Sequence, residues 1–161
     1  MRKVCSALLL ALAIVAPTAA QAQAKHPDYS GTWVLDTARS DKGQMVPSKM
    51  SLKIGQTDAG LTVDRAQTSQ MGETTTSFKY TLDGSPSPNT LIMGGNTVNL
   101  VSVVTWEGDS PVITSDMKIG DNEAKSIEKW TLGDGGKSLT VNRKISVQGQ
   151  EFGSNLVLVK Q

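Results

Sequence analysis

The sequence has little of the chemistry on which most catalytic and metal sites depend. It contains one cysteine, one histidine and only 4% aromatic residues in 161 positions. A single cysteine, Cys5, cannot form an intrachain disulfide, and no cluster of thiolates or imidazoles is available to bind zinc or iron. The lone histidine, His26, lies in the polar stretch AKHPDYS (24–30), where we expect an exposed ring that binds neither metal nor haem.

An excess of charge of one sign is also absent. The 16 basic residues nearly balance the 15 acidic ones, so nothing suggests the basic face that nucleic-acid binding requires. No serine lies in a nucleophile-elbow motif, and GDGGK (133–137) is expected to be a hairpin turn rather than a phosphate-binding loop. Only one acid, Glu128, can be placed inside the fold, whereas paired-carboxylate hydrolysis requires two. We therefore expect neither an enzyme nor a cofactor.

The only long apolar run lies at the start of the chain. Arg2 and Lys3 precede VCSALLLALAIVA (4–16), and small residues follow Pro17. This is the layout of a secretory signal peptide, and the run is too short to span a membrane. We predict a signal peptide over residues 1–24, cleaved after Ala24 or Ala22, and a periplasmic or secreted protein. The mature chain 25–161 has no predicted membrane segment, and Cys5 lies too early for a lipid anchor.

The mature chain has almost no stretch of helical periodicity. Short runs rich in Val, Ile, Thr, Phe and Tyr alternate with Gly, Asp, Asn and Pro, a pattern typical of all-β barrels and sandwiches. Only 37–48 has room for a helical turn. The sequence predicts one domain, a single up-and-down antiparallel β-barrel of about 8–10 strands whose closure removes its edges. The expected strands cover residues 30–36, 49–56, 61–69, 73–82, 89–93, 97–107, 111–119, 123–132, 138–147 and 151–160.

Two turns predict which side chains face the interior. A two-residue turn at Gly135-Gly136 is a natural hairpin loop, because both glycines accept positive φ. It sets Leu132 opposite Leu139, Trp130 opposite Val141 and Glu128 opposite Arg143. A turn at Asp121-Asn122 sets Ile119 opposite Ala124, Met117 opposite Ser126 and Ser115 opposite Glu128. Because side chains alternate along a strand, both turns indicate one apolar face that surrounds a small polar group.

That polar group supplies the candidate binding residues. Arg65 joins it from the strand LTVDR (61–65), and Tyr80 belongs to the inward face of TTTSFKYTL (74–82). In one interpretation these side chains orient the head of an amphipathic ligand. In the other they form a structural ion pair, with an arginine stacked on Trp33 or Trp130. The predicted binding residues are Arg65, Tyr80, Ser115, Glu128 and Arg143.

The opening GTWVLD (31–36) resembles the G-x-W signature of the lipocalin and fatty-acid-binding (calycin) barrels. The strands LTVDR (61–65) and LTVNR (139–143) and the segment KWTL (129–132) are similar to those of uncharacterised secreted bacterial lipocalin-like proteins. The resemblance implies a barrel base closed by Gly31 and Trp33, with a basic side chain packed over the tryptophan. Arg143 is the matching candidate for that basic side chain.

Two departures from the fatty-acid-binding pattern limit what the resemblance implies. The last strand, SNLVLVKQ (154–161), lacks the Arg-x-Tyr pair that holds a carboxylate, and 37–48 is too short for a helix-turn-helix lid. Specific fatty-acid binding by that mode is therefore not expected.

Three hypotheses for the function follow. The first is an exported barrel that binds a small apolar or amphipathic ligand in its interior, favoured by small inward residues such as Ser115, Ala124, Ser126 and Thr76. The alternative is a non-enzymatic envelope or interaction module whose barrel is filled by its own side chains. A carbohydrate-binding sandwich would need a row of surface aromatics, which seven aromatic residues hardly provide. The sequence does not indicate the oligomeric state.

Overall fold

The computed structural model describes residues 26–42, 46–70 and 72–161. The predicted signal peptide and both predicted cleavage sites lie outside these residues. The strands, in chain order, are β1 (Gly31–Leu35), β2 (Lys49–Gln56), β3 (Gly60–Ser69), β4 (Gly72–Thr81), β5 (Ser87–Met93), β6 (Asn96–Glu107), β7 (Ser110–Ile119), β8 (Asn122–Gly133), β9 (Ser138–Val147) and β10 (Gln150–Lys160). A single 3₁₀ turn, η1 (Asp134–Gly136), joins β8 to β9.

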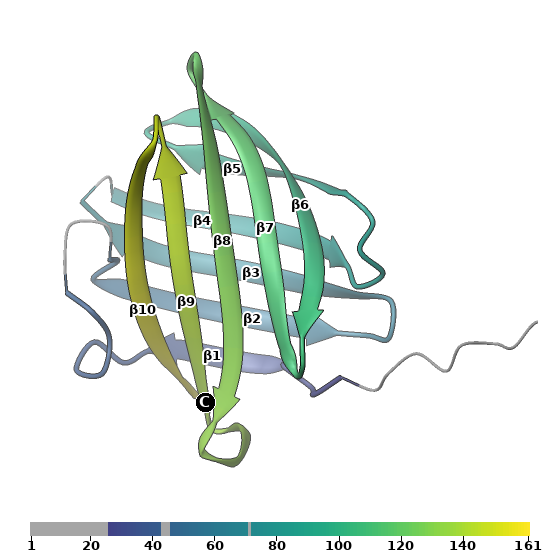
Figure 1. Ribbon diagram of the computed structural model, residues 1–161. Helices are drawn as coiled ribbons and strands as arrows, with labels where there is room; N and C mark the ends of the chain where they lie inside the picture. Colours follow the sequence, from purple (N-terminus) through teal and green to yellow (C-terminus); the bar gives the residue numbers. More distant parts are fainter. Residues whose placement is uncertain (1–25, 43–45, 71) are drawn as a thin grey trace, which may run out of the picture.

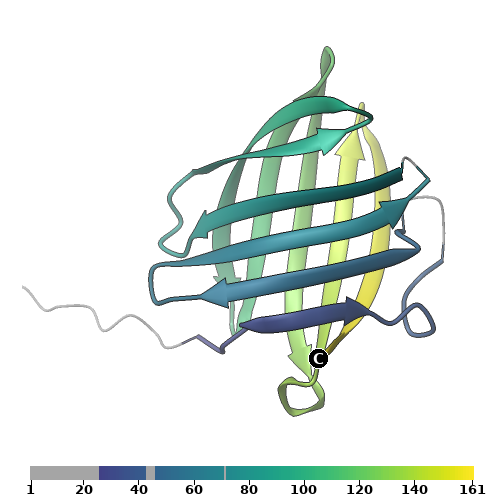
Figure 2. The same ribbon diagram turned by 180° about the vertical axis from the view of Figure 1, so that it is seen from behind.

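All ten strands form one antiparallel sheet in the order β4-β3-β2-β1-β10-β9-β8-β7-β6-β5. The sheet folds over so that β1–β4 form one layer and β6–β10 cross them steeply in the other (Figures 1 and 2). Each strand starts and ends within two residues of its predicted bounds, because alternation of apolar and polar residues is a local signal. The predicted all-β, up-and-down barrel is confirmed.

The barrel is closed by side chains where β4 meets β5. No backbone ladder joins these two strands. Instead, the backbone N–H of Lys79 donates to Asn89 Oδ1 at 2.8 Å, and Asn89 Nδ2 donates to the Lys79 carbonyl at 3.0 Å. The N–H of Thr81 donates to Ser87 Oγ at 3.0 Å. The predicted closure is therefore correct in outline, but β4 and β5 remain edge strands. Backbone groups of β4 are hydrogen-bonded there by polar side chains of β5.

One end of the barrel is filled with large side chains. Trp33 and Trp130 are completely buried, and Tyr29 packs beside Trp130 with its ring centroid at 6.2 Å. The Tyr29 hydroxyl donates to the carbonyl of Asp109 at 2.8 Å, which ties the chain before β1 to the β6–β7 turn. Fully buried side chains around them include Leu52, Leu61, Val63, Leu139, Val141, Leu156 and Leu158. We call this the closed end.

The predicted residue pairing is correct in one of the two hairpins and wrong in the other. The β8–β9 pairs Leu132–Leu139, Trp130–Val141 and Glu128–Arg143 are present, although the loop is longer than predicted and spans Asp134–Lys137. The β7–β8 register was wrong by two residues, with the observed pairs Ile119–Asn122, Met117–Ala124 and Ser115–Ser126. The tight turn there is Gly120-Asp121, since Gly120 takes the positive φ of 60° that a two-residue turn requires. A two-residue shift keeps every side chain on its predicted face.

Residues 37–40 form a turn, and the described part of 37–48 contains no helix. Among the residues that the structure describes, no helix has the length and apolarity needed to cross a lipid bilayer.

Candidate functional site

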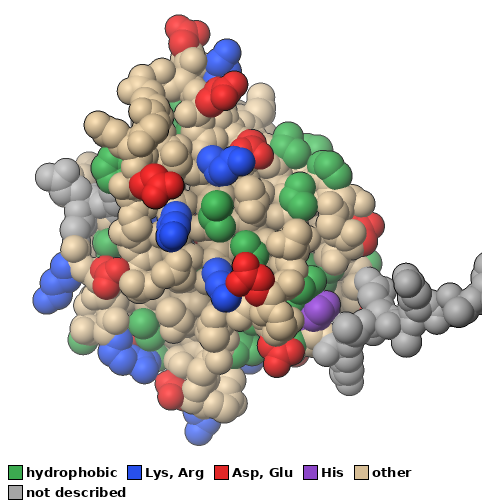
Figure 3. Space-filling model, in the orientation of Figure 1, with side chains coloured by type: hydrophobic (Ala, Val, Ile, Leu, Met, Phe, Trp, Pro, Cys, Tyr) green, Lys and Arg blue, Asp and Glu red, His purple; other side chains and the backbone are tan. Residues whose placement is uncertain are grey.

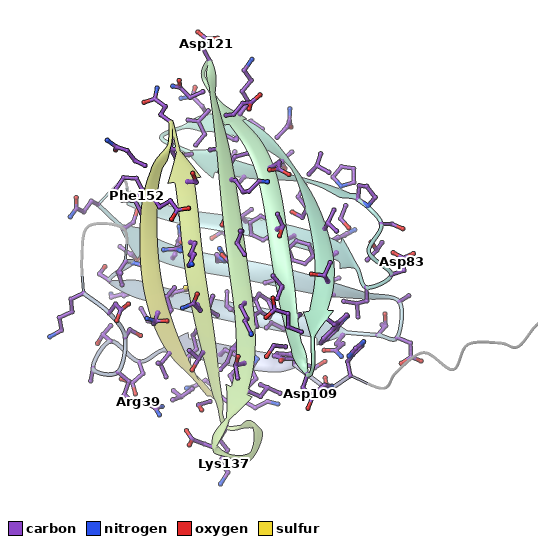
Figure 4. All side chains as sticks on the ribbon, viewed as in Figure 1. Arg39, Asp83, Asp109, Asp121, Lys137 and Phe152 are labelled. Carbon is purple, nitrogen blue, oxygen red and sulfur yellow. The ribbon has the colours of Figure 1, made fainter. Side chains whose placement is uncertain are left out.

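The end of the barrel opposite the closed end is hollow. A cavity of about 320 Å³ lies between β3, β4 and β5 on one side and β7, β8 and β9 on the other. It reaches the turns of the upper end in Figure 4, where Asp121 is labelled, while Asp109 and Lys137 mark the closed end. Its lining residues are Arg65, Gln67, Ser69, Thr74, Thr76, Phe78, Leu91, Ile92, Met93, Gly94, Met117, Ile119, Ser126, Glu128, Arg143, Ile145 and Val147.

An ion pair crosses the interior at the floor of this cavity. Arg65 on β3 and Glu128 on β8 come from opposite layers and form two parallel bonds, Nη1 to Oε1 at 3.1 Å and Nη2 to Oε2 at 2.8 Å. The indole Nε1 of Trp130 donates to the same Oε2 at 3.2 Å. Arg65 also lies over the Phe78 ring, with its guanidinium carbon 5.4 Å from the centroid. These hydrogen bonds and the contact with the Phe78 ring hold the Glu128 carboxylate and the Arg65 guanidinium in place.

The second arginine, Arg143, lies directly across from Glu128 on β9 and also lines the cavity. It is 8% exposed. Burial lowers its pKa, and the nearby Arg65 charge lowers it further, against the opposing effect of Glu128. The charged residues of the cavity wall are thus two arginines and one glutamate. Positive charge exceeds negative charge at the floor.

The carboxyl of Glu128 stays ionised despite its burial. Burial raises the pKa of Glu128, but the Arg65 charge, the hydrogen bonds from Arg65 and the Arg143 charge together outweigh it. The net result is a pKa below the ordinary glutamate value. Burial lowers the pKa of Arg65, and the Glu128 carboxylate more than compensates, so that its net pKa is raised. Both partners are therefore charged at neutral pH.

Three of the five predicted binding residues line the cavity, namely Arg65, Glu128 and Arg143. The other two lie inside the barrel but outside the cavity lining. Ser115 is buried and shares a 2.8 Å hydrogen bond with Ser102 Oγ on β6. Tyr80 is buried nearer the closed end, with its ring 5.9 Å from that of Phe78, and burial raises its pKa. A ligand contact for any of the five stays a prediction.

The predicted base residues lie at the closed end, but the basic side chain over Trp33 is not Arg143. Lys160, opposite Trp33 in the β1–β10 register, holds its Nζ 5.1 Å from the Trp33 ring centroid. A Cβ on Gly31 would lie 2.6 Å from Lys160 Cε, and Gly31 has φ 133°. The glycine therefore gives the lysine access to the indole. Arg143 instead lines the cavity floor.

His26 was expected to be exposed, and it is instead stacked. Its ring lies 3.5 Å from that of Trp106, with an angle of 1° between the planes. The ring still reaches the surface of the molecule (Figure 3). The sequence could not predict this contact, since the two residues are 80 positions apart. In the part of the chain that the structure describes, no group of three His, Cys, Asp or Glu side chains is arranged to hold a metal ion.

The sequence analysis missed part of the cavity wall. Gln67 and Thr74, which are paired between β3 and β4, line the cavity two residues beyond Arg65 and Thr76. Their signal was available, because i and i+2 share a face of a strand. Phe152, labelled on β10 in Figure 4, pairs with the cavity residue Ile145 and is 40% exposed, which indicates a position at the rim.

Comparisons with known proteins identify the fold and no sequence family. No protein-family model matches the chain. No curated protein sequence matches it.

Solved structures do match. A zebrafish ileal bile acid-binding protein complexed with cholic acid superposes with a TM-score of 0.53 at 14% identity, over 83% of this chain and 98% of that one. Secretory abundant heat soluble protein 4 from Ramazzottius varieornatus gives a TM-score of 0.52 at 18% identity, over 83% and 94%. A fatty-acid-binding protein from Manduca sexta gives 0.47 at 16% identity, over 82% and 99%. The chain has the calycin-type β-barrel fold.

Proposed function

We propose that this protein binds a small amphipathic acid inside its barrel. The observation that carries the proposal is the pair of buried arginines, with a single glutamate between them, at the floor of the cavity. The floor has two guanidinium groups and one carboxylate, and this net positive charge favours an anionic head group beside Arg143. The apolar part of the ligand would occupy the remaining cavity of about 320 Å³. This volume is at the small end of the range for ligand pockets.

The fold and the comparisons support a binding role. The zebrafish bile acid-binding protein, which has the same fold, holds cholic acid. We further propose that residues 1–24 direct export, so that binding takes place in the periplasm or outside the cell. The alternative, an interaction module without a ligand, requires a barrel filled by its own side chains. Only the closed end is filled in this way.

Isothermal titration of the mature chain, residues 25–161, with palmitate and with cholate tests the proposal. At least one of these acids is expected to bind with one-to-one stoichiometry. Absence of heat from both, at concentrations below micelle formation, would overturn ligand binding and favour the interaction module.

A matched pair of variants tests the position of the head group. Arg143→Gln removes the buried charge, whereas Lys144→Gln removes its exposed neighbour on the outer face of β9. Hydrogen bonds to charged groups contribute about 1.5–3 kcal/mol. We therefore expect Arg143→Gln to weaken binding by at least about tenfold and Lys144→Gln to leave it unchanged. Equal affinities for the two variants would place the acid elsewhere.

A further inference from the structure

The cavity above the charged floor has two chemically different walls. The wall formed by β3 and β4 is polar, with Gln67 and Ser69 on β3 and Thr74 and Thr76 on β4. Gln67 pairs with Thr74, and Thr76 pairs with Arg65, so the polar groups form a continuous patch on two neighbouring strands. From Arg65 to Ser69 this patch extends roughly 13 Å along the strand, at about 3.3 Å per residue.

The facing wall is mainly apolar. On β5, β7 and β9 its cavity residues are Leu91, Met93, Met117, Ile119, Ile145 and Val147. Among the described residues that line the cavity, Ser126 on β8 is the one hydrogen-bonding side chain of this wall outside the charged floor. The division follows from the fold, because β3–β4 and β7–β9 belong to the two layers that face one another (Figure 1).

The polar wall favours a hydrogen-bonding ligand. The Oε1 atom of Gln67 is a buried acceptor with no hydrogen-bond partner among the described residues. A flexible hydrocarbon chain would cover this atom and the threonine hydroxyls without bonding to them, which penalises binding. A ligand with hydroxyl groups along one side can donate to Gln67 and bond to Thr74 and Thr76. Its other side would contact the methionines and branched aliphatic side chains of the facing wall.

We infer that the ligand is a facially amphipathic acid, a rigid ring skeleton with hydroxyl groups along one face, an apolar opposite face and an acidic group near Arg143. This inference rests on the proposed function and narrows it. Straight-chain acids of similar size are the poorer ligands, because they cannot match one polar and one apolar wall at once.

Cholate and lithocholate provide a matched pair of probes. They share one ring skeleton and one carboxylate, and cholate has two additional hydroxyl groups on the same face. Titrated separately into the mature chain below their micellar concentrations, cholate is expected to bind at least about tenfold more tightly, although lithocholate is the more hydrophobic. Equal or tighter binding of lithocholate overturns the inference. If palmitate binds in that case, the proposed function stands; if none of the three binds, both fail.

Variants of the polar wall test the same inference from the protein side. Thr74→Val combined with Thr76→Val keeps the side-chain shape and removes both hydroxyls. We expect the cholate preference over lithocholate to fall by about tenfold while palmitate affinity is kept or improved, which shows that the barrel is intact. Thr75→Val, on the outer face of the same strand, is the control and is expected to leave the preference unchanged. An unchanged preference in the double variant contradicts the inference.

Discussion

Glu128 is the only carboxylate among the charged residues of the cavity wall, so its removal leaves that wall with two guanidinium groups and no carboxylate. It accepts two hydrogen bonds from Arg65 and one from Trp130. A charge left buried without its partner destabilises a protein strongly. The stability of the interior therefore depends on this side chain more than on any surface ion pair.

We expect Glu128→Ala to lower the free energy of unfolding by about 3–5 kcal/mol, measured by urea denaturation. Glu123→Ala removes an exposed carboxylate from the outer face of the same strand and is expected to change stability by less than about 0.5 kcal/mol. A loss below about 0.5 kcal/mol for Glu128→Ala would mean that the carboxylate is not buried against Arg65.

Glu128 also makes the stability of the protein depend on pH. The pKa of Glu128 is lower in the folded protein than the ordinary value of 4.5, because Arg65 and Arg143 outweigh the effect of burial. A lowered pKa gives stability that is fully present above the unfolded-state value and is lost as the pH falls through the folded-state value. We therefore expect wild-type stability to decline below about pH 4.5.

Glu128→Gln provides the measurement. Its urea midpoint is expected to vary less between pH 5 and pH 2.5 than that of the wild type, since the substituted side chain no longer titrates. If the urea midpoints of the two proteins fall in parallel as the pH is lowered, other carboxylates account for the loss of stability.

At the scale of elements, the junction between β4 and β5 distinguishes this barrel from a fully hydrogen-bonded one. The Asn89 amide bonds both the N–H and the carbonyl of Lys79, as a neighbouring strand would. Polar side chains therefore protect an edge that a ladder does not cover. The cavity borders this junction through Thr76 and Phe78 on one side and Leu91 on the other.

Asn89→Ala is expected to speed hydrogen exchange of the Lys79 amide, because its only described acceptor is the Asn89 side chain. The accompanying loss of stability is expected to be modest, about 0.5–1.5 kcal/mol, since these bonds are exposed to water. Thr90→Ala, on the outer face of β5, is the control and is expected to leave that amide unchanged. An amide that keeps its protection in Asn89→Ala would mean that the side chain does not close the junction.

At the scale of the whole molecule, the barrel combines a packed half and a hollow half. Large aromatic and leucine side chains fill the closed end, and Lys160 covers Trp33 there. The other end retains a cavity, which is lined by aliphatic and methionine side chains together with charged and hydroxyl-bearing ones. Among the described residues, no helix covers the hollow end.

Export is the whole-molecule property that awaits a test. The intact mass of the protein recovered from the cell envelope or the medium is expected to correspond to residues 25–161, or to 23–161 if cleavage follows Ala22. Replacing both small residues, Ala22→Leu with Ala24→Leu, is expected to leave the precursor uncleaved. Gln23→Leu, between them, is the control and is expected to be processed normally. A full-length mass for the wild type would contradict the predicted signal peptide.

The sequence by itself determined the strands, the fold class and the face on which each inward residue lies. These features depend on local alternation and turn residues, and they tolerate errors of two residues, as the β7–β8 register shows. Only the tertiary structure decided which charges meet. Arg65 and Glu128 lie on strands that are not neighbours in the sheet, so no turn or register predicts their bond. The same holds for Lys160 over Trp33, for His26 on Trp106 and for the two walls of the cavity. Each depends on how the two layers cross, which is set by packing over the whole barrel rather than by any single strand.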